Sequence, residues 1–339
     1  MGKSSGRSGL LRRPKTITRS DRVPKNVKPV KARRLIRLFH SLQKHKCSLI
    51  KKLNENLGLK NEINVENFED YLSSYHPLLF YKYEVFFAKE QKHKEECLLE
   101  TRLGKLLTTE EVLSMLAYVK AKIIDRGGME AYQVASSQGQ EGKRGGDSLG
   151  KLIEWLIDPK SPYKRILGPY SKALEIGCLS PYNKISVCGI FDQVTRIDLN
   201  SQDVHIIQQD FMKRPLPKRQ DEKFNLISCS LVLNFVPSPK ERGDMLRRIT
   251  HFLVPPNSIT VSSLFLVLPL PCIENSRYCD KKHLESIMLS LGFLPTRFYS
   301  SKKLAYWLFD WNGSISTVTY PKRPLHSGSR RNNFAVVLS

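Results

Sequence analysis

The stretch ALEIGCLSPYN, from Ala173 to Asn183, is the most informative indication of the fold in this chain. It opens with an apolar strand, Ala173–Ile176, and Gly177 follows at the point where the chain must turn. A glycine at the end of a buried strand lets the backbone approach a bound nucleoside closely. The stretch therefore predicts the first strand of an open α/β sheet, with Gly177 beside a nucleoside ligand.

Acidic residues follow the next two predicted strands. Asp198 ends the strand Gln193–Ile197, where a carboxylate can accept hydrogen bonds from both ribose hydroxyls. Asp210 follows the strand Val204–Ile207, where it can accept from the exocyclic amine of an adenine while Phe211 covers the ring. An acidic residue after a strand is more often a helix cap, so each signal alone is weak. Together with the glycine, the two acids outline a nucleoside site at the carboxyl ends of successive strands.

The C-terminal part of the chain alternates apolar strands with helices. Strands joined by crossover helices indicate a mostly parallel sheet with helices on both faces. We therefore expect an α/β, Rossmann-like domain over residues 147–339, whose first helix is capped by Asp147 or Ser148. Leu304–Phe309 and Phe334–Leu338 predict a closing antiparallel hairpin. The other segments are the strands Phe224–Ser228 and Ser258–Leu268 and the helices Leu149–Ile157 and Glu241–Leu253.

The glycine spacing distinguishes between the cofactors that such a fold binds. A dinucleotide needs G-x-G-x-x-G at the start of a helix, because its pyrophosphate is held by bare backbone amides. Here Gly177 is followed by CLSP, so the other glycines of that fingerprint are missing. S-adenosylmethionine carries no phosphate and tolerates this loss. We therefore expect S-adenosyl-L-methionine as the cofactor, and the missing fingerprint argues against a nicotinamide oxidoreductase.

The positive charge is concentrated at the N-terminus. The chain carries 55 Lys and Arg against 32 Asp and Glu, a net charge of +23, and residues 1–60 alone hold eighteen basic and two acidic residues. Phosphate neutralisation gives such a segment sequence-independent affinity for nucleic acid. A solvated tail or a nuclear import address are the alternatives. Because all nucleoside motifs lie beyond Ala173, we expect residues 1–60 to add RNA affinity and to contribute little to cofactor binding.

A helical region precedes the α/β domain. Residues 1–30 are mostly Gly, Ser, Pro, Lys and Arg with very few large apolar residues, and they predict a disordered basic arm. Residues 31–146 predict a helical N-terminal region that begins with a basic amphipathic helix. The expected helices are Lys31–Leu57, Asn67–Leu72, Pro77–Leu99 and one to about Ile124 that starts with a capping box at Thr108.

Several stretches of the chain form a recognisable series. They are ALEIGCL (173–179), RIDLN (196–200), DFMKRPLP (210–217), SLVLNFVPSPKERGDML (230–246) and SLFLVLPLPCIENSRY (263–278), with AYQVASSQGQ (131–140) and RGGDS (144–148) upstream. Together these stretches resemble the fungal 25S ribosomal RNA adenine-N1 methyltransferase family, a class I, Rossmann-like family. The resemblance implies a methyltransferase that acts with S-adenosylmethionine on N1 of an adenine in 25S rRNA during ribosome biogenesis. It further implies a ribosomal RNA or pre-ribosomal partner and a place in the nucleus and nucleolus, and we expect a monomer.

The resemblance also carries site residues. It implies that Gly177 and Asp198 contact the cofactor and that Asp210 lies beside its adenine. Adenine N1 has an in-plane lone pair and needs no strong base, so the enzyme's task is to position the flipped base and to compensate charge. We expect Asn234 to be the catalytic residue, an amide that orients the base. The alternative is that Asn234 caps a turn and that Phe235 belongs to the core.

Other classes of protein fit the sequence less well. The eight histidines form no H-E-x-x-H or other paired metal spacing, so no metal is expected. The longest apolar run, Ile259–Leu270, is too short to span a membrane. A non-catalytic protein that senses S-adenosylmethionine is the alternative function. The basic N-terminus favours the RNA enzyme, because a sensor has no need for that charge.

Overall fold

The structure is a computed structural model. It describes residues 29–92, 107–128, 131–132, 134–135, 148–158, 160, 171–201, 203–257 and 261–339. Residues 1–28 of the arm expected over 1–30, and residues 136–147, which hold most of the glycine-rich segment before α7, lie outside the described residues. Within the described part, no helix is both long and apolar enough to cross a membrane.

The N-terminal part is a bundle of helices with its own core. The basic amphipathic helix is confirmed, and it ends before Gly58, whose φ of +68° suits glycine. The capping box is confirmed too: Thr108 accepts from the backbone N–H of Glu111, whose carboxylate accepts from the N–H of Thr108. The helices are α1 (Pro29–Leu57), α2 (Phe68–Tyr75), α3 (Pro77–Lys92) and α5 (Thr109–Asp125). Their fully buried side chains include Leu49, Leu53, Leu72 and Leu113.

The C-terminal part contains one seven-stranded sheet of order β3-β2-β1-β4-β5-β7-β6. The first five strands in this order are parallel, and β7 runs antiparallel to both of its neighbours. The chain therefore leaves β1 toward one edge and returns at β4, and this reversal marks the place where open α/β sheets bind ligands. The strands are β1 (Lys172–Ile176), β2 (Gln193–Asp198), β3 (Ile207–Gln208), β4 (Leu226–Ser230), β5 (Ser263–Pro269), β6 (Phe293–Ser300) and β7 (Leu304–Trp311).

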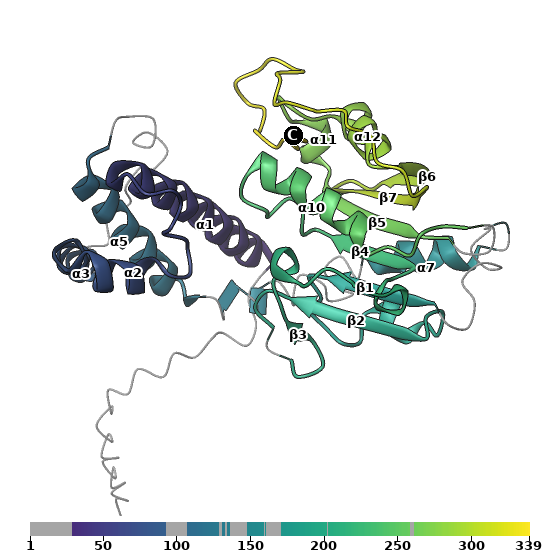
Figure 1. Cartoon of the computed structure of the whole chain (residues 1–339), viewed down its shortest axis with the longest axis horizontal. Coiled ribbons are helices and arrows are strands. Elements are labelled where there is room, and N and C mark those ends of the chain that lie inside the picture. The colour runs from purple at the N-terminus through teal and green to yellow at the C-terminus, as the bar shows by residue number, and fades with distance from the viewer. Residues whose placement is uncertain are drawn as a thin grey trace, which may run out of the picture.

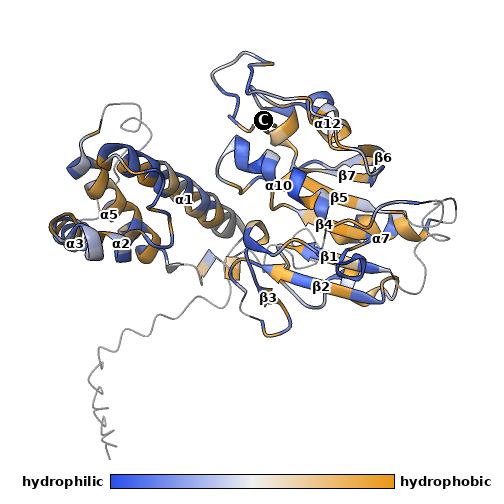
Figure 2. Cartoon of the chain, viewed as in Figure 1, coloured by the Kyte–Doolittle hydropathy of each residue, from blue (hydrophilic) through white to orange (hydrophobic). Residues whose placement is uncertain are grey.

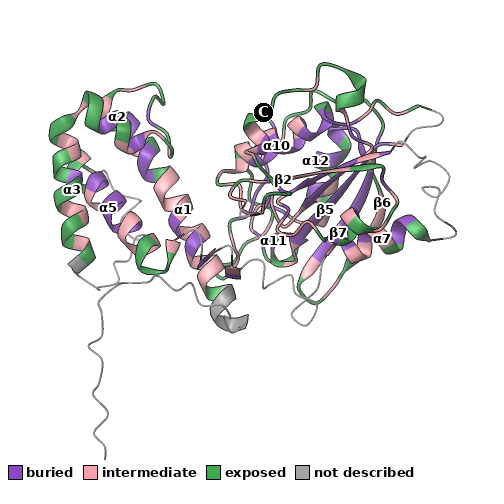
Figure 3. Ribbon diagram, turned by 90° about the horizontal axis from the view of Figure 1, so that it is seen from below, coloured by how far each residue is buried: buried purple, intermediate pink, exposed green. Residues whose placement is uncertain are grey.

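Helices cover both faces of the sheet (Figure 1). On β5, Leu264, Leu266 and Leu268 pack with α10 and α12, while Phe265 and Val267 face the core under α7 and α9. This explains why β5 is apolar along most of its length, as Figure 2 shows, and why the sheet centre is buried in Figure 3. The helices are α7 (Leu149–Ile157), α9 (Lys184–Val187), α10 (Pro239–His251), α11 (Pro271–Glu274) and α12 (Lys281–Ser290).

Two expected strands are wrong. β7 pairs with β6 across a short turn, whereas residues 334–338 form no strand, and Leu338 makes only an isolated bridge to Tyr320. The segment Val204–Ile207 is mostly a turn, because Asp203 accepts from the backbone N–H of His205 and bends the chain. Val204, expected in a buried strand, is 95% exposed.

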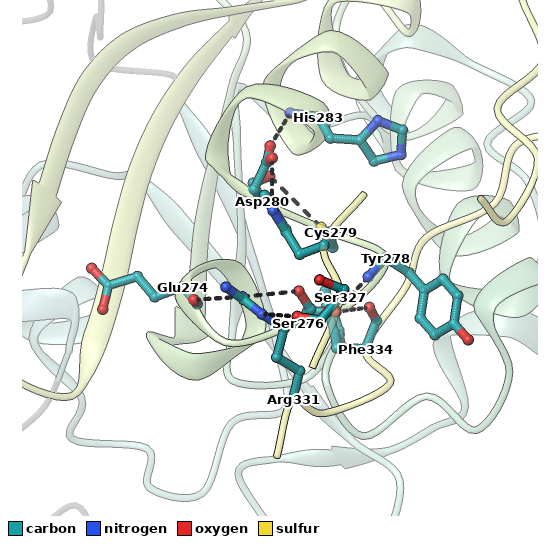
Figure 4. A network of polar contacts seen from close by, with 10 residues as sticks. Glu274, Ser276, Tyr278, Cys279, Asp280, His283, Ser327, Arg331 and Phe334 are labelled. Atoms are coloured by element: carbon teal, nitrogen blue, oxygen red, sulfur yellow. Dashed lines mark hydrogen bonds and ion pairs between the residues drawn. The ribbon is translucent and has the colours of Figure 1, made fainter. Parts of the chain in front are cut away.

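The C-terminal tail is instead held by polar contacts to α11 and to the segment that follows it (Figure 4). The Ser276 hydroxyl donates to the carbonyl of Phe334, and the Arg331 guanidinium donates to the carbonyls of Glu274 and Ser276. The backbone N–H of Arg277 donates to the carbonyl of Asn332. These bonds fix the tail against the end of β5 without a strand pairing.

Candidate functional site

Gly177 lies at the turn after β1, where its φ is +76°. The N–H groups of Gly177 and Cys178 both donate to the carbonyl of Ile197 on β2, at 2.8 and 3.0 Å. A Cβ at position 177 would lie 2.4 Å from Cγ2 of Val232 in the loop after β4. The position therefore requires glycine for its backbone conformation and for the close approach of that loop.

A buried polar pair holds the segment after Gly177. The Asn183 side chain donates to Oε1 of Glu175 at 2.6 Å, and both side chains are buried. The Cys178 thiol donates to the carbonyl of Ser180, and burial raises the pKa of this thiol. Cys178 is thus a structural thiol. Glu175 was not among the predicted site residues, although a carboxylate inside an apolar strand is a signal for a buried polar contact.

Asp198 is the last residue of β2, as expected. Its Oδ1 accepts from the backbone N–H of Asn200 at 2.8 Å. Burial raises the pKa of Asp198 above that of an ordinary carboxyl, with the bonds from Asn200 and Leu199 opposing the rise. A partly desolvated carboxylate is stabilised by further donors, which the two hydroxyls of a ribose supply. The residues present therefore fit a nucleoside at this edge.

Asp210 follows β3 and caps the short 3-10 helix Phe211–Lys213. Its Oδ1 accepts from the N–H of Met212 at 2.8 Å, so the alternative role of a helix cap is realised by one of its oxygens. Phe211, which we expected to cover the adenine, is 4% exposed and packs against Phe252, with ring centroids 5.2 Å apart. Core packing accounts for Phe211 without a ligand.

The loop Ser230–Pro237 follows β4 and faces Gly177. Leu231 adopts φ +58°, a left-handed conformation that is uncommon for a branched side chain, and such strain is concentrated at functional sites. The loop closes with a bond from the N–H of Phe235 to the carbonyl of Val232, at 2.8 Å. Oδ1 of Asn234 is buried and accepts no hydrogen bond from the residues that the structure describes. An amide that caps the turn would use this oxygen for it, so the arrangement favours a ligand-directed Asn234.

Arg242 fastens this loop from behind. It lies in α10, is 4% exposed, and donates to the carbonyls of Val236 at 3.0 Å, Pro237 at 3.4 Å and Ala335 at 2.7 Å. Its guanidinium also lies 4.8 Å from the ring centroid of Phe334. Arg242 was not among the predicted site residues, although it stands three, four and seven residues before buried residues of the same helix (Met245, Leu246 and Ile249).

Ser148 corrects another expectation. Among the described residues it makes no cap hydrogen bond at the start of α7, and its hydroxyl instead lies 2.6 Å from that of Ser230. Asp147, the other expected cap, lies outside the described residues. Ser148, the one described residue of RGGDS, thus contacts the end of β4, where the loop that carries Asn234 begins.

The helical region also reaches this loop. The imidazole of His40, on α1, lies parallel to the ring of Phe235 with the centroids 3.5 Å and the planes 12° apart. In Figure 1, α1 runs from the helical bundle to the sheet. Phe235 is therefore not part of the sheet's own core. The described part of residues 1–60 therefore contacts this loop through His40, and the small contribution of residues 1–60 to cofactor binding stays a prediction.

These features define the class of the protein. A mostly parallel sheet of this order, with a glycine turn after β1 and a carboxylate at the end of β2, is that of a Rossmann-like, S-adenosylmethionine-dependent methyltransferase. Within the described ranges, no cluster of three or more His, Cys, Asp or Glu could hold a metal. Among solved structures, the chain is similar to a methyltransferase from Methanosarcina mazei (15% identity, 46% of this chain, 99% of that chain, TM-score 0.34) and to the N-methyltransferase NodS from Bradyrhizobium japonicum with S-adenosyl-L-homocysteine (14%, 48%, 98%, TM-score 0.32).

The comparison of sequences identifies the family. The family model for Bmt2, 25S rRNA (adenine(2142)-N(1))-methyltransferase, matches residues 117–336. A Saccharomyces cerevisiae protein with that same description is 37% identical over 93% of this chain and 94% of its own length. A 25S rRNA adenine-N(1) methyltransferase of Schizosaccharomyces pombe is 44% identical over 62% of this chain and 76% of its own length. The chain belongs to the Bmt2 family of 25S rRNA adenine-N1 methyltransferases.

Proposed function

We propose that this chain methylates N1 of an adenine in 25S rRNA, with Gly177, Asp198 and Asp210 at the cofactor and Asn234 at the target base. Family membership supports the reaction. The single observation that carries the assignment of the base site is Oδ1 of Asn234, which is buried, without a partner among the described residues, and held on a strained loop at the reversal of strand order. This oxygen suits the two hydrogens of an adenine N6 amine.

Each residue at the cofactor has a distinct task. Asp198 accepts from the ribose hydroxyls, which offsets the cost of its burial. Asp210 keeps one oxygen on its helix cap and offers the carboxylate to the exocyclic amine of the cofactor's adenine. Gly177 leaves the backbone between them free of a side chain. S-adenosylmethionine, when bound in this class of enzyme, supplies a methyl group activated by its sulfonium.

The chemistry at the target base is mainly a matter of position. N1 forms the new bond to the methyl carbon with its own lone pair as the bond from carbon to sulfur breaks, so no side chain needs to remove a proton first. The positive charge passes from sulfur to the methylated adenine. Asn234, by accepting from N6, holds N1 in line with the methyl, and its oxygen dipole stabilises the charge that develops on the base.

The remaining parts of the molecule serve RNA binding in this proposal. Residues 1–28 hold nine Lys and Arg and one acidic residue, a composition that favours binding to phosphates. We retain the division into an arm over 1–30, a helical region over 31–146 and a methyltransferase domain over 147–339, with action as a monomer in the nucleolus on ribosomal RNA or a pre-ribosome. The separate cores of the bundle and the sheet support that division.

The proposed function is tested by mapping N1-methyladenosine in 25S rRNA as stops in reverse transcription. Cells with the gene should show a stop at one adenine, cells without it should not, and Asn234→Ala should reduce the stop. Purified protein with either naked RNA or pre-ribosomes distinguishes the two substrates. Unchanged stops in cells that lack the gene would overturn the proposal.

A further inference from the structure

His40 is the point at which the helical region meets the loop that carries Asn234. Its imidazole lies flat against Phe235, with centroids 3.5 Å apart, and Tyr132 stands edge-on to it at 5.0 Å. Tyr132 in turn stacks on Phe39 at 4.5 Å. Three segments far apart in the sequence thus bring four rings together directly beside Asn234.

The imidazole of His40 is neutral and carries a buried polar atom. Burial, with a smaller contribution from Lys44, lowers the pKa of His40 from 6.5 to about 3, so the ring is uncharged at neutral pH. Nε2 of His40 is buried and has no hydrogen-bond partner among the residues that the structure describes. Buried polar atoms of folded proteins are nearly always hydrogen-bonded, and the exceptions call for an explanation. A ligand that forms a hydrogen bond with Nε2 of His40 is one such explanation.

The surroundings of His40 favour an anionic ligand. Lys44 follows one helical turn later, and the nearby Arg242 contributes with burial to lowering the pKa of Lys44. Arg242 directs its donors to carbonyl oxygens rather than to a carboxylate. Two buried or half-buried cations this close repel each other, and a phosphate between or beside them relieves that repulsion. A nucleotide combines a flat base, which can stack on Phe235, with the negative charge that these cations attract.

We propose that His40 is a residue of the target-base site: α1 and the loop after β4 together form the site for the target adenine, with the ring of Phe235, backed by His40, as its stacking surface and Nε2 of His40, in the plane of the imidazole, as a hydrogen-bonding atom beside it. The inference rests on the proposed function, because it takes Asn234 to be the neighbour of the adenine. It assigns the helical region a part in the methyl transfer itself, in addition to RNA affinity.

Two substitutions separate the stacking from the hydrogen bond. His40→Phe keeps a flat ring against Phe235 and removes both nitrogens, whereas His40→Ala removes the ring as well. His45→Phe is the matched control, because His45 lies on the same helix but is rotated about 140° away from His40. All variants are made in the full chain and assayed for N1 methylation of an RNA fragment that carries the target adenine, with kcat, the KM for RNA and the Kd of S-adenosylmethionine measured side by side.

We expect His40→Phe to lower kcat about three- to tenfold, the effect of one lost hydrogen bond, and His40→Ala to lower it further. The Kd of S-adenosylmethionine and the unfolding midpoint should stay near those of the wild type in His40→Phe, and His45→Phe should keep the wild-type kcat. Wild-type kcat in His40→Phe, with only the midpoint lowered in His40→Ala, would show that the contact merely joins the two parts of the chain, and would overturn the inference.

Asn234→Ala in the same assay separates this inference from the proposed function. If Asn234→Ala is slow while both His40 variants match the wild type, the inference about His40 alone fails. If the wild-type protein methylates neither the fragment nor pre-ribosomes, the proposed function fails and His40 has no base to bind.

Discussion

Gly177 and Val232 face each other across the reversal of strand order, so closely that a Cβ on Gly177 would lie 2.4 Å from Cγ2 of Val232. Gly177 belongs to the turn proposed for the cofactor, and Val232 lies two residues before Asn234. The part of the site proposed for the cofactor and the part proposed for the target base therefore meet at this contact. A substitution on either side of it is expected to disturb both.

Gly177→Ala is expected to weaken S-adenosylmethionine binding even though alanine is small. The left-handed backbone at φ +76° costs a residue with a Cβ about 1–2 kcal/mol, and the overlap with Val232 adds to that cost. The double variant Gly177→Ala with Val232→Ala removes the overlap and should recover part of the loss. Calorimetric Kd values and unfolding midpoints measure both effects. Equal Kd values for the wild type and Gly177→Ala would refute this account.

Asp198→Asn is expected to separate binding from stability. The raised pKa of Asp198 means that the ionised form of this carboxyl is less stable in the folded than in the unfolded protein. At neutral pH, removing the charge should therefore not destabilise the cofactor-free chain. Loss of a charged acceptor should weaken S-adenosylmethionine binding about ten- to a hundredfold. Urea unfolding measures the stability of the variant, and calorimetry measures its Kd for S-adenosylmethionine. A destabilised Asp198→Asn with unchanged Kd is the opposite of what we expect.

The same raised pKa gives cofactor binding a pH dependence. As the pH falls toward the pKa of Asp198, the carboxyl becomes protonated and loses its charge as an acceptor, so the Kd of S-adenosylmethionine should rise. Because burial moves this pKa above its ordinary value of 3.8, the rise should begin at a higher pH than for an exposed carboxylate. Titrations of the wild type and Asp198→Asn at several pH values measure it. A Kd with the same pH dependence in both proteins would mean that another group is responsible.

Asn234→Ala is expected to lower kcat about tenfold or more and to leave the Kd of S-adenosylmethionine within about twofold, because the lost bond is made only to the target base. Asn234→Ser retains an oxygen on a shorter side chain, and its kcat should lie between those of the wild type and Asn234→Ala. Single-turnover methylation of the RNA fragment measures the rate. A higher Kd with an unchanged rate would place Asn234 at the cofactor instead.

Arg242→Met is expected to destabilise the chain by about 2–4 kcal/mol, since three carbonyl groups lose their donor in a buried place. Arg242→Lys should recover little, because an ammonium lacks the planar fork that reaches all three. Lys240→Met, on the exposed side of the same helix, is the control and should lie within about 0.5 kcal/mol of the wild type. Urea unfolding supplies the free energies, and equal values for the two helix positions would contradict the role of Arg242.

Deletion of residues 1–28 is expected to weaken RNA binding and to flatten its dependence on salt. For each phosphate that the shortened protein no longer neutralises, the slope of log K against log salt should become shallower by about 0.7–0.9. Deletion of residues 1–60 is unsuitable, because it removes the buried Leu49 and Leu53 of the helical core as well as His40. Binding curves at several salt concentrations with full-length and shortened protein are the measurement. Equal slopes would leave the import address as the role of this segment.

The features that depend only on nearby residues in the chain could be predicted from the sequence alone. The amphipathic period predicts α1, the capping box at Thr108 predicts the start of α5, and the turn at Gly177 and the carboxylate at Asp198 each follow their own strand. Parallel strands place such residues at one edge of a sheet whatever the rest of the chain does, so the cofactor side of the site could be outlined before the fold was known.

The features that depend on contacts between distant parts of the chain could be seen only in the folded structure. Nothing within several residues of His40 indicates that it lies against Phe235, and the apolar run 334–338 suits a strand as well as the tail that Arg242 holds. Strand period specifies which side chains share a face but leaves the choice of partner to loop lengths and packing. The cofactor motifs are local, whereas the surface proposed for the base is built from α1 and the loop after β4, and therefore exists only in the folded chain.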